Sequence, residues 1–158
     1  MQGVYPGSFD PFTLGHKDIV ERALKMCDKL YIAVSDNINK KHLFSKDERV
    51  EMIKETFKGN EKIVVESFQG LLVDYVLSKK ASFIIRGLRA VSDFEYEFQM
   101  AFANRNIESS IETVFMVPSS QYLFLSSTIV RDIARNNGDI SKLVPEKVME
   151  NFQKFAKK

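Results

Sequence analysis

The 158-residue sequence has little cysteine, little net charge and no long apolar run. Its one cysteine, Cys27, excludes an internal disulfide and a cysteine-based metal site, and its helical register with Ile19 and Ala23 predicts a core position. A reducing cytoplasm fits this cysteine usage. The 23 Lys and Arg against 21 Asp and Glu leave a net charge of +2, which allows local phosphate binding but gives little support for nucleic acid as a partner.

Membrane insertion and secretion are also disfavoured. The longest apolar run, residues 30–34, is far shorter than the roughly 20 residues that cross a bilayer. The first residues lead directly into a strand-like segment, without a basic region followed by an apolar one. We therefore expect a protein without a membrane segment.

Groups for covalent catalysis are scarce as well. The sequence offers no Ser/His/Asp set, no cysteine in a basic setting and no His/Asp/Glu cluster with metal-ligand spacing. Hydroxyls, one histidine, lysines and arginines are what the predicted loops contain. These groups position and neutralise phosphoryl groups rather than form covalent intermediates.

Apolar segments of two periodicities alternate along the chain. Near-continuous apolar runs predict strands buried on both faces of a parallel sheet, at residues 4–9, 30–34, 63–68, 82–85 and 113–117. Helical periodicity predicts helices at 16–27, 45–57, 71–77, 94–102, 129–136 and after Pro145. A capping-box spacing at Ser45 and Glu48 opens the second helix, and Asn137-Gly138 ends the fifth. The alternation predicts one doubly wound, Rossmann-like α/β domain over residues 1–158, with a five-stranded parallel sheet and helices on both faces.

The fourth predicted helix carries an apolar stripe that includes Phe94, Phe98 and Phe102. We expect Phe94 and Phe98 to fill the core rather than to stack on a nucleotide base. Packing of this helix against a neighbouring subunit is the alternative.

The loop after the first strand, residues 5–16, combines glycines, a hydroxyl and a histidine. Gly7 and Gly15 allow the backbone to approach a ligand closely, and Ser8 adds the hydroxyl. His16 falls in the first turn of a helix, where free backbone N–H groups and the helix dipole favour an anion. A histidine that only caps the helix is the alternative. Because these features occur together, we favour a phosphate-binding loop.

Positively charged side chains follow the predicted second and fourth strands. Lys40 lies after the second strand, where it can pair with phosphate charge or be solvated, and His42 is expected at the surface. Arg86 and Arg89 follow the fourth strand, and their spacing suits a bidentate grip on phosphates, although loop arginines also pair with acidic residues. Glu97 is expected to pair with one of these arginines, to orient Arg89, or to accept a hydrogen bond from a ribose hydroxyl or a base amine.

Three hydroxyl residues, 126–128, begin the fifth helix. Capping of the helix explains one of them, whereas a second anion-binding helix N-terminus explains all three. Because ligands of doubly wound sheets bind beyond the carboxyl ends of the strands, the two helix starts are expected to face one crevice. Together they can hold a triphosphate.

The four loops read YPGSFDPFTLGH, KK, IRGLRAVSDFEYE and SSTIVR. The TxGH and SSTxxR elements resemble the HxGH nucleotidylyltransferase superfamily, and the combination resembles bacterial phosphopantetheine adenylyltransferases over the whole chain. The resemblance implies an enzyme of coenzyme A biosynthesis that transfers AMP from ATP to 4′-phosphopantetheine, giving dephospho-coenzyme A and pyrophosphate. It implies Mg²⁺ bound through the ATP phosphates and a homohexamer, and it leaves open whether coenzyme A is a feedback ligand.

The resemblance also implies roles for individual residues. His16 would stabilise the pentacovalent α-phosphorus, and Lys40 and Arg86 would hold the acceptor phosphate and the transition-state charge. Implied acceptor-binding residues are Ser8, Lys40, Leu72 and Arg86. Implied ATP-binding residues are Ser8, Phe9, His16, Gly87, Leu88, Arg89, Glu97, Tyr122, Leu123, Phe124, Leu125, Ser126, Ser127 and Thr128. No protein ligand to a metal is implied. We expect direct in-line attack without a covalent enzyme intermediate, because the acceptor phosphate is already anionic.

The sequence departs from the family pattern at two positions, and its residues leave three alternative functions to consider. Ser8 stands where many relatives carry threonine, and Tyr122 replaces a common tryptophan. From the residues alone, the acceptor can also be nicotinamide mononucleotide or an alcohol phosphate. A nucleotide-sensing or RNA-binding module that holds ATP without turnover is a second alternative. An aminoacyl-tRNA synthetase fragment is disfavoured by the length and by the lack of a KMSKS-type loop.

Overall fold

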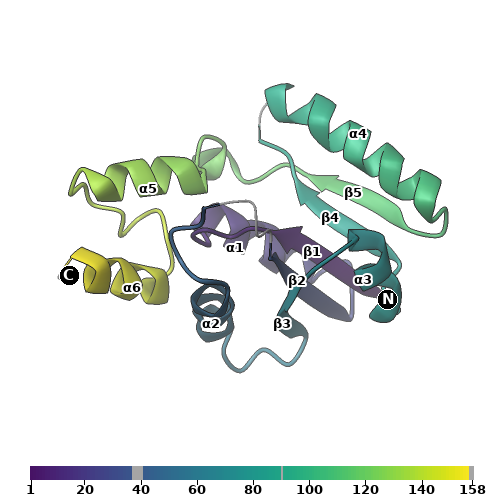
Figure 1. The fold of residues 1–158 in the computed structure, drawn as a ribbon, viewed down its shortest axis with the longest axis horizontal. Helices are drawn as coiled ribbons and strands as arrows, with labels where there is room; N and C mark the ends of the chain where they lie inside the picture. Colours follow the sequence, from purple (N-terminus) through teal and green to yellow (C-terminus); the bar gives the residue numbers. More distant parts are fainter. Residues whose placement is uncertain (37–40, 90, 157–158) are drawn as a thin grey trace.

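A computed structural model describes residues 1–36, 41–89 and 91–156, which form a five-stranded sheet flanked by helices. The strands are β1 (Gln2–Gly7), β2 (Lys29–Ser35), β3 (Ile63–Phe68), β4 (Phe83–Gly87) and β5 (Glu112–Met116). All neighbouring strands pair in parallel, in the order β3-β2-β1-β4-β5 (Figure 1). This arrangement confirms the predicted doubly wound α/β fold.

The crevice of this sheet lies between β1 and β4. From β1 the chain builds outward through β2 to β3, and then crosses to the other side of β1 to place β4 and β5 (Figure 1). Connections leave β1 and β4 in opposite directions, which opens the sheet at the carboxyl ends of these two strands. The loops after β1 and β4 therefore face each other.

β1 lies two residues earlier in the chain than predicted. The backbone turns left-handed at Phe9, whose φ is 48°, so the strand ends at Gly7 rather than at Phe9. The ring of Phe9 then lies over Gly7, where a Cβ atom would stand 2.8 Å from the ring Cζ atom. Glycine is required at position 7 for this reason, and the hydroxyl of Ser8 beyond it lies 3.4 Å from the hydroxyl of Ser35 at the end of β2.

Helices cover both faces of the sheet (Figure 1). They are α1 (Leu14–Ala23), α2 (Lys46–Thr56), α3 (Leu72–Ser78), α4 (Val91–Ile107), α5 (Ser127–Arg135) and α6 (Glu146–Ala156), with a 3-10 turn η1 at Ser120–Tyr122. Helices α1, α2, α5 and α6 pack on the face to which Tyr5 and Ile85 point, whereas α3 packs on the face of Val4 and Ile84. No helix in the described ranges is long and apolar enough to cross a membrane.

Helix ends follow the sequence signals closely. The Ser45 hydroxyl accepts from the Glu48 N–H at 3.3 Å, and the Glu48 carboxylate accepts from the Ser45 N–H at 2.8 Å, which confirms the predicted capping box. After α5 the chain turns at Asn137, with a φ of 58°, and the Gly138 N–H donates to the Ile133 carbonyl. Cys27 is buried in the core, as predicted.

The phenylalanines of α4 do not fill the core, so this prediction was wrong. Phe94, Phe98 and Phe102 are 44%, 55% and 61% exposed. Helix α4 flanks β5 at the edge of the sheet, and these three rings remain largely in contact with solvent. Phe94 contacts Phe98 and Phe115 instead, with ring centroids 5.8 and 6.4 Å away.

The capping box at the start of α2 is expected to be cooperative. We expect Ser45→Ala to lower the free energy of unfolding by about 1 kcal/mol, because the Glu48 N–H loses its acceptor. Ser109→Ala, at an exposed residue outside the helices, is the matched control. Denaturant unfolding of Ser45→Ala, of Glu48→Ala and of the double variant measures the coupling between the two side chains, and fully additive effects would contradict a reciprocal cap.

Candidate active site

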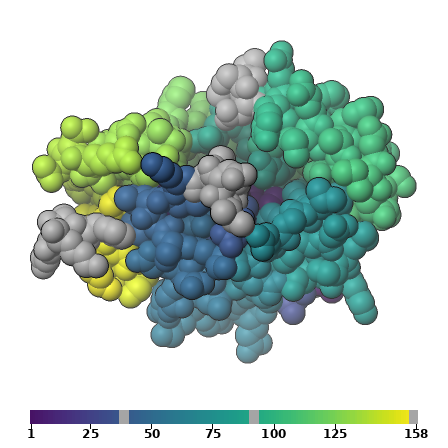
Figure 2. Space-filling model, in the orientation of Figure 1, coloured from purple at the N-terminus to yellow at the C-terminus, as the bar shows by residue number. Residues whose placement is uncertain are grey.

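A cavity of about 370 Å³ opens at the carboxyl ends of β1 and β4. It is built from the loops after β1, β4 and β5, from the start of α1 and from the second turn of α4. Predicted site residues that line it are Ser8, Phe9, His16, Arg86, Gly87, Arg89, Glu97, Tyr122 and Leu125. In the space-filling view the surface is hollowed near the middle of the molecule, beside α4 (Figure 2). His16 and Arg86, 70 positions apart in the sequence, thus share one crevice.

His16 enters this cavity as part of the cap of α1. Its Nδ1 atom accepts from the Thr13 backbone N–H at 3.0 Å, and the Thr13 hydroxyl accepts from the His16 N–H at 3.3 Å. An Nδ1 that accepts carries no proton, so the proton of the neutral ring is on Nε2. Burial, with a smaller contribution from the Arg89 cation, lowers the pKa of His16 from 6.5 to about 3. The residue is therefore a neutral hydrogen-bond donor at physiological pH.

Arg86 is held by a carboxylate. Its Nε donates to Glu97 Oε2 at 2.6 Å and its Nη2 to Oε1 at 2.5 Å, a bidentate pair between β4 and α4. Burial alone would lower the pKa of Arg86, but the Glu97 carboxylate outweighs it and raises that pKa. Nη1 donates to the Pro6 carbonyl at 3.1 Å. Bonds within the described residues thus engage three of the five N–H groups and leave two for a ligand.

The expected pairing of Glu97 with an arginine is confirmed, but the arginine that it orients needs a correction. Its two oxygens accept from Arg86, whereas the sequence had suggested Arg89 as the residue that it orients. Arg89 is directed elsewhere, because its Nη1 donates to the Leu125 carbonyl at 3.1 Å. Arg89 therefore ties the loop after β4 to the loop after β5, on the rim of the same cavity.

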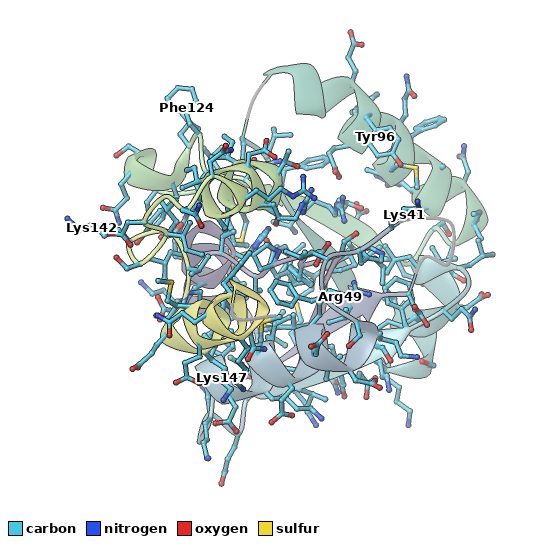
Figure 3. All side chains as sticks on the ribbon, turned by 60° about the vertical axis from the view of Figure 1, so that its left-hand side comes forward. Lys41, Arg49, Tyr96, Phe124, Lys142 and Lys147 are labelled. Atoms are coloured by element: carbon cyan, nitrogen blue, oxygen red, sulfur yellow. The ribbon has the colours of Figure 1, made fainter. Side chains whose placement is uncertain are left out.

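The segment from Tyr122 to Thr128 enters the site only in part. Tyr122 and Leu125 line the cavity, while Phe124 is 84% exposed and points outward (Figure 3). Ser126 accepts from the Ile129 N–H and caps α5, and Ser127 donates to the Pro11 carbonyl at 2.8 Å. Each of these hydroxyls, and that of Thr128 with Arg131, has a protein partner. Bonds within the protein therefore account for all three hydroxyls at the start of α5.

The other predicted residues lie at the edges of the site or outside the described ranges. Leu72 lines a second cavity of about 170 Å³, which shares Arg86, Tyr96 and Glu97 with the first. Leu88 is half-buried and its N–H donates to the Met116 carbonyl. Leu123 is half-buried beside η1. Lys40 lies outside the described residues.

Asp10 is a connecting residue that the sequence analysis missed. Its carboxylate accepts from the backbone N–H groups of Leu43 and Phe44 at 2.7 and 2.9 Å, and its carbonyl accepts from Arg131. His42 was expected at the surface, but it is half-buried, with Nδ1 3.6 Å from Asp10 Oδ2. The correction follows from residues 42–44, which lie against the Asp10 carboxylate. No periodicity in the sequence indicates this contact.

Arg49 is a second residue that the sequence analysis missed. It is 1% exposed and forms no ion pair within the described part of the chain (Figure 3). Nη1 donates to the Ser8 carbonyl at 2.6 Å and to the Ser35 carbonyl at 3.2 Å. The guanidinium thus fixes the backbone just beyond β1 and at the end of β2. A signal was available, because position 49 shares the buried face of α2 with Met52 and Ile53.

Comparison with known proteins agrees with this geometry. The profile of the cytidylyltransferase-like family matches residues 4–133. The phosphopantetheine adenylyltransferase of Nautilia profundicola is 49% identical over 151 residues, which cover 96% of this chain and 98% of that protein. The Geobacter sulfurreducens protein of the same name is 53% identical over 154 residues, covering 97% and 94%. The chain belongs to the phosphopantetheine adenylyltransferase family.

The family assignment confirms the resemblance inferred from the four loops, and the protein is an enzyme of the nucleotidyltransferase class. Among solved structures, one described as a nicotinate-nucleotide adenylyltransferase from Vibrio parahaemolyticus superposes with a TM-score of 0.68. That match covers 94% of this chain and 89% of the other at 19% identity, so it supports the fold alone.

The protonation state of His16 can be measured directly. We expect the ring of His16 in the ligand-free enzyme to titrate near pH 3, far below 6.5, in NMR spectra of protein labelled with ¹³C-histidine. With two histidines in the chain, the spectrum of His42→Gln assigns the resonance. Since the unfolded chain binds this proton near pH 6.5, His16 contributes stability above that pH that is lost as the pH falls toward 3. A midpoint near 6.5 for His16 would contradict the desolvated, capped ring.

Proposed function

We propose that this enzyme transfers AMP from ATP to 4′-phosphopantetheine, giving dephospho-coenzyme A and pyrophosphate, as a step of coenzyme A biosynthesis. The observation that carries the proposal is the single cavity that brings a neutral histidine donor together with two arginines. The names of the relatives at about 50% identity supply the substrates. The cavity supplies what phosphoryl chemistry requires, which is fixed donors and positive charge.

The reaction proposed is a direct in-line displacement. An oxygen of the acceptor phosphate forms a bond to the α-phosphorus of ATP, and the bond from that phosphorus to the bridging oxygen of the β-phosphate breaks. Pyrophosphate leaves with the bonding electron pair. The acceptor is anionic at neutral pH, so no protein base has to remove a proton. No covalent enzyme intermediate is part of this scheme.

His16 and Arg86 are the catalytic residues that the structure supports in this scheme. The Nε2–H of His16 donates to an equatorial oxygen of the α-phosphorus, where charge develops in the transition state. The two free N–H groups of Arg86 hold the acceptor phosphate, and Glu97 fixes the plane of that guanidinium. Lys40 is proposed as a third catalytic cation from the family resemblance.

Substrate subsites are proposed along the two cavities. The 4′-phosphopantetheine phosphate lies against Ser8 and Arg86, and its arm extends into the second cavity past Leu72 and Met100, whose side chains suit an apolar chain. The nucleotide occupies the first cavity. Its proposed contacts are Ser8, Phe9, His16, Gly87, Leu88, Arg89, Glu97 and the segment from Tyr122 to Thr128.

Mg²⁺ is proposed to bind through the ATP phosphates. Within the described residues no group of three or more His, Cys, Asp or Glu side chains forms a metal site. The carboxylate that lines the cavity, Glu97, is already engaged by Arg86. These residues fit a metal carried by phosphate oxygens, where it would neutralise charge on the pyrophosphate leaving group.

We further propose a cytoplasmic homohexamer, with coenzyme A as a ligand of the same cavities. The exposed stripe of Phe94, Phe98 and Phe102 on α4 supports self-association, because a contiguous apolar helix face is unfavourable in water. The number six and the feedback ligand follow from the family resemblance. Sedimentation equilibrium tests the assembly, and a monomer at micromolar concentration would exclude it.

The function is tested by pyrophosphate release. We expect release with ATP and 4′-phosphopantetheine, and none with nicotinamide mononucleotide or an alcohol phosphate as acceptor. His16→Ala is expected to lose about 10²- to 10³-fold in kcat, because one transition-state donor is removed. Lys17→Ala, in the same helix and outside the cavity, is the control. Turnover only with nicotinamide mononucleotide would overturn the proposal, and unchanged turnover in His16→Ala would remove its role.

Arg49 is expected to act on the reaction through Ser8. We expect Arg49→Met to fold, since a buried charge is replaced by an apolar side chain of similar length. Its kcat/KM should fall about 10- to 100-fold, because the Ser8 carbonyl loses the donor that fixes it. Lys54→Met, an exposed position of α2, controls for the loss of a cation. A wild-type kcat/KM in Arg49→Met would show that the loop is fixed without it.

A further inference from the structure

Tyr5 is a buried tyrosine in the wall of the active-site cavity. It lies on β1, the strand at the switch point, and is 4% exposed. Its ring packs edge-on against Phe9, with centroids 5.3 Å apart, and lies 6.4 Å from the ring of His16. The same cavity is lined by Arg86 and Arg89. Phe9 and His16 also contact each other, with centroids 5.2 Å apart, so the three rings form one packed cluster that holds the phenol in the cavity wall.

The hydroxyl of Tyr5 has no partner among the described residues, although buried tyrosine hydroxyls are usually hydrogen-bonded. It lies close to Gly87, where an added Cβ atom would stand 3.6 Å from it. Within the described chain, the side-chain polar atoms that are both enclosed and unpartnered belong to Gln2, His42 and Arg49. The Tyr5 hydroxyl is therefore open to the cavity rather than enclosed by protein.

The surroundings of this hydroxyl favour an anionic acceptor. Burial raises the pKa of Tyr5 well above its ordinary value, against the opposing effect of the Arg86 and Arg89 cations, so the phenol keeps its proton. Nearby guanidinium groups attract the phenol oxygen and repel the phenol hydrogen. The Glu97 carboxylate also acts on Tyr5, but both of its oxygens accept from Arg86, so the hydrogen is left to the free space of the cavity. An anion attracted to the two arginines would place an oxygen where that hydrogen points.

We propose that Tyr5 is a ligand-binding residue of this active site, whose hydroxyl donates a hydrogen bond to a phosphoryl oxygen held beside Arg86 and Arg89. The inference rests on the proposed function for the identity of the substrates. Tyr5 forms no covalent bond and transfers no proton. The phosphoryl oxygen belongs to the nucleotide or to the acceptor, since both carry phosphate groups, and the binding of each ligand to Tyr5→Phe distinguishes them.

Tyr5→Phe tests the proposal, because it removes one oxygen and keeps the ring against Phe9. We expect the melting temperature to be retained and kcat/KM to fall about 10- to 100-fold, as for the loss of a hydrogen bond to a charged group. Tyr31→Phe, in the adjacent strand and on the opposite face, is the matched control and should retain wild-type kcat/KM.

Calorimetric titration of the wild type and Tyr5→Phe shows whether the hydroxyl binds a nucleotide phosphate or the acceptor phosphate. It also distinguishes both cases from a purely structural role of Tyr5. Weaker binding of ATP with unchanged binding of adenosine assigns the hydrogen bond to a nucleotide phosphate. Weaker binding of 4′-phosphopantetheine alone assigns it to the acceptor phosphate. An equal loss of adenosine and ATP affinity, or wild-type kcat/KM and affinities in Tyr5→Phe, would overturn the proposal.

Failure of the proposed function has a different signature. If the wild-type protein does not release pyrophosphate from ATP and 4′-phosphopantetheine, the substrate assignment fails before any variant is measured. Titration of the wild type and Tyr5→Phe with inorganic pyrophosphate still tests the hydroxyl in that case. A difference in affinity would support a phosphoryl-binding role, and identical affinities would exclude it.

Discussion

The central position of β1, paired with β2 on one side and β4 on the other, is the constraint on which the site depends. Gly3 lies opposite Phe83 and Val4 opposite Ile84, and continuing this register places Gly7 opposite Gly87. Residues that follow one strand are therefore delivered beside residues that follow the other, 80 positions later in the chain. Neither strand end offers a complete phosphate site by itself, and parallel pairing brings together the donors that the reaction needs.

Long-range hydrogen bonds then fix the loops that the sheet brings together. Arg49 holds the backbone beyond β1 to the end of β2, Asp10 holds the loop after β2, and Arg89 joins the loops after β4 and β5. Ser127 attaches the start of α5 to the first loop. These bonds link a side chain to a backbone group, and all but that of Arg89 come from residues that do not line the cavity. Such a supporting network is what preorganised binding of phosphoryl groups requires.

Much of the fold and part of the site could be predicted from the sequence, for identifiable physical reasons. Buried parallel strands and capped helices have local signatures, so the five strands and the cap at Ser45 were found. His16 and Arg86 each follow a predicted strand, so the sequence indicated that both lie at the same edge of the sheet, and both line one cavity. The choice of Arg86 rather than Arg89 as the partner of Glu97, the partial burial of His42 and the exposure of Phe94 depend on how separate elements meet, which no local pattern encodes.

The cap that joins Thr13 to His16 has a further consequence. The bond that orients the imidazole is also a bond that begins α1, so the ring cannot rotate without exposing the helix terminus. Forming the helix therefore selects one tautomer and one rotamer before any substrate arrives. The conformational entropy of the side chain is lost during folding rather than during each turnover. A donor of this kind returns to its starting state as soon as the products leave, with no proton to recover.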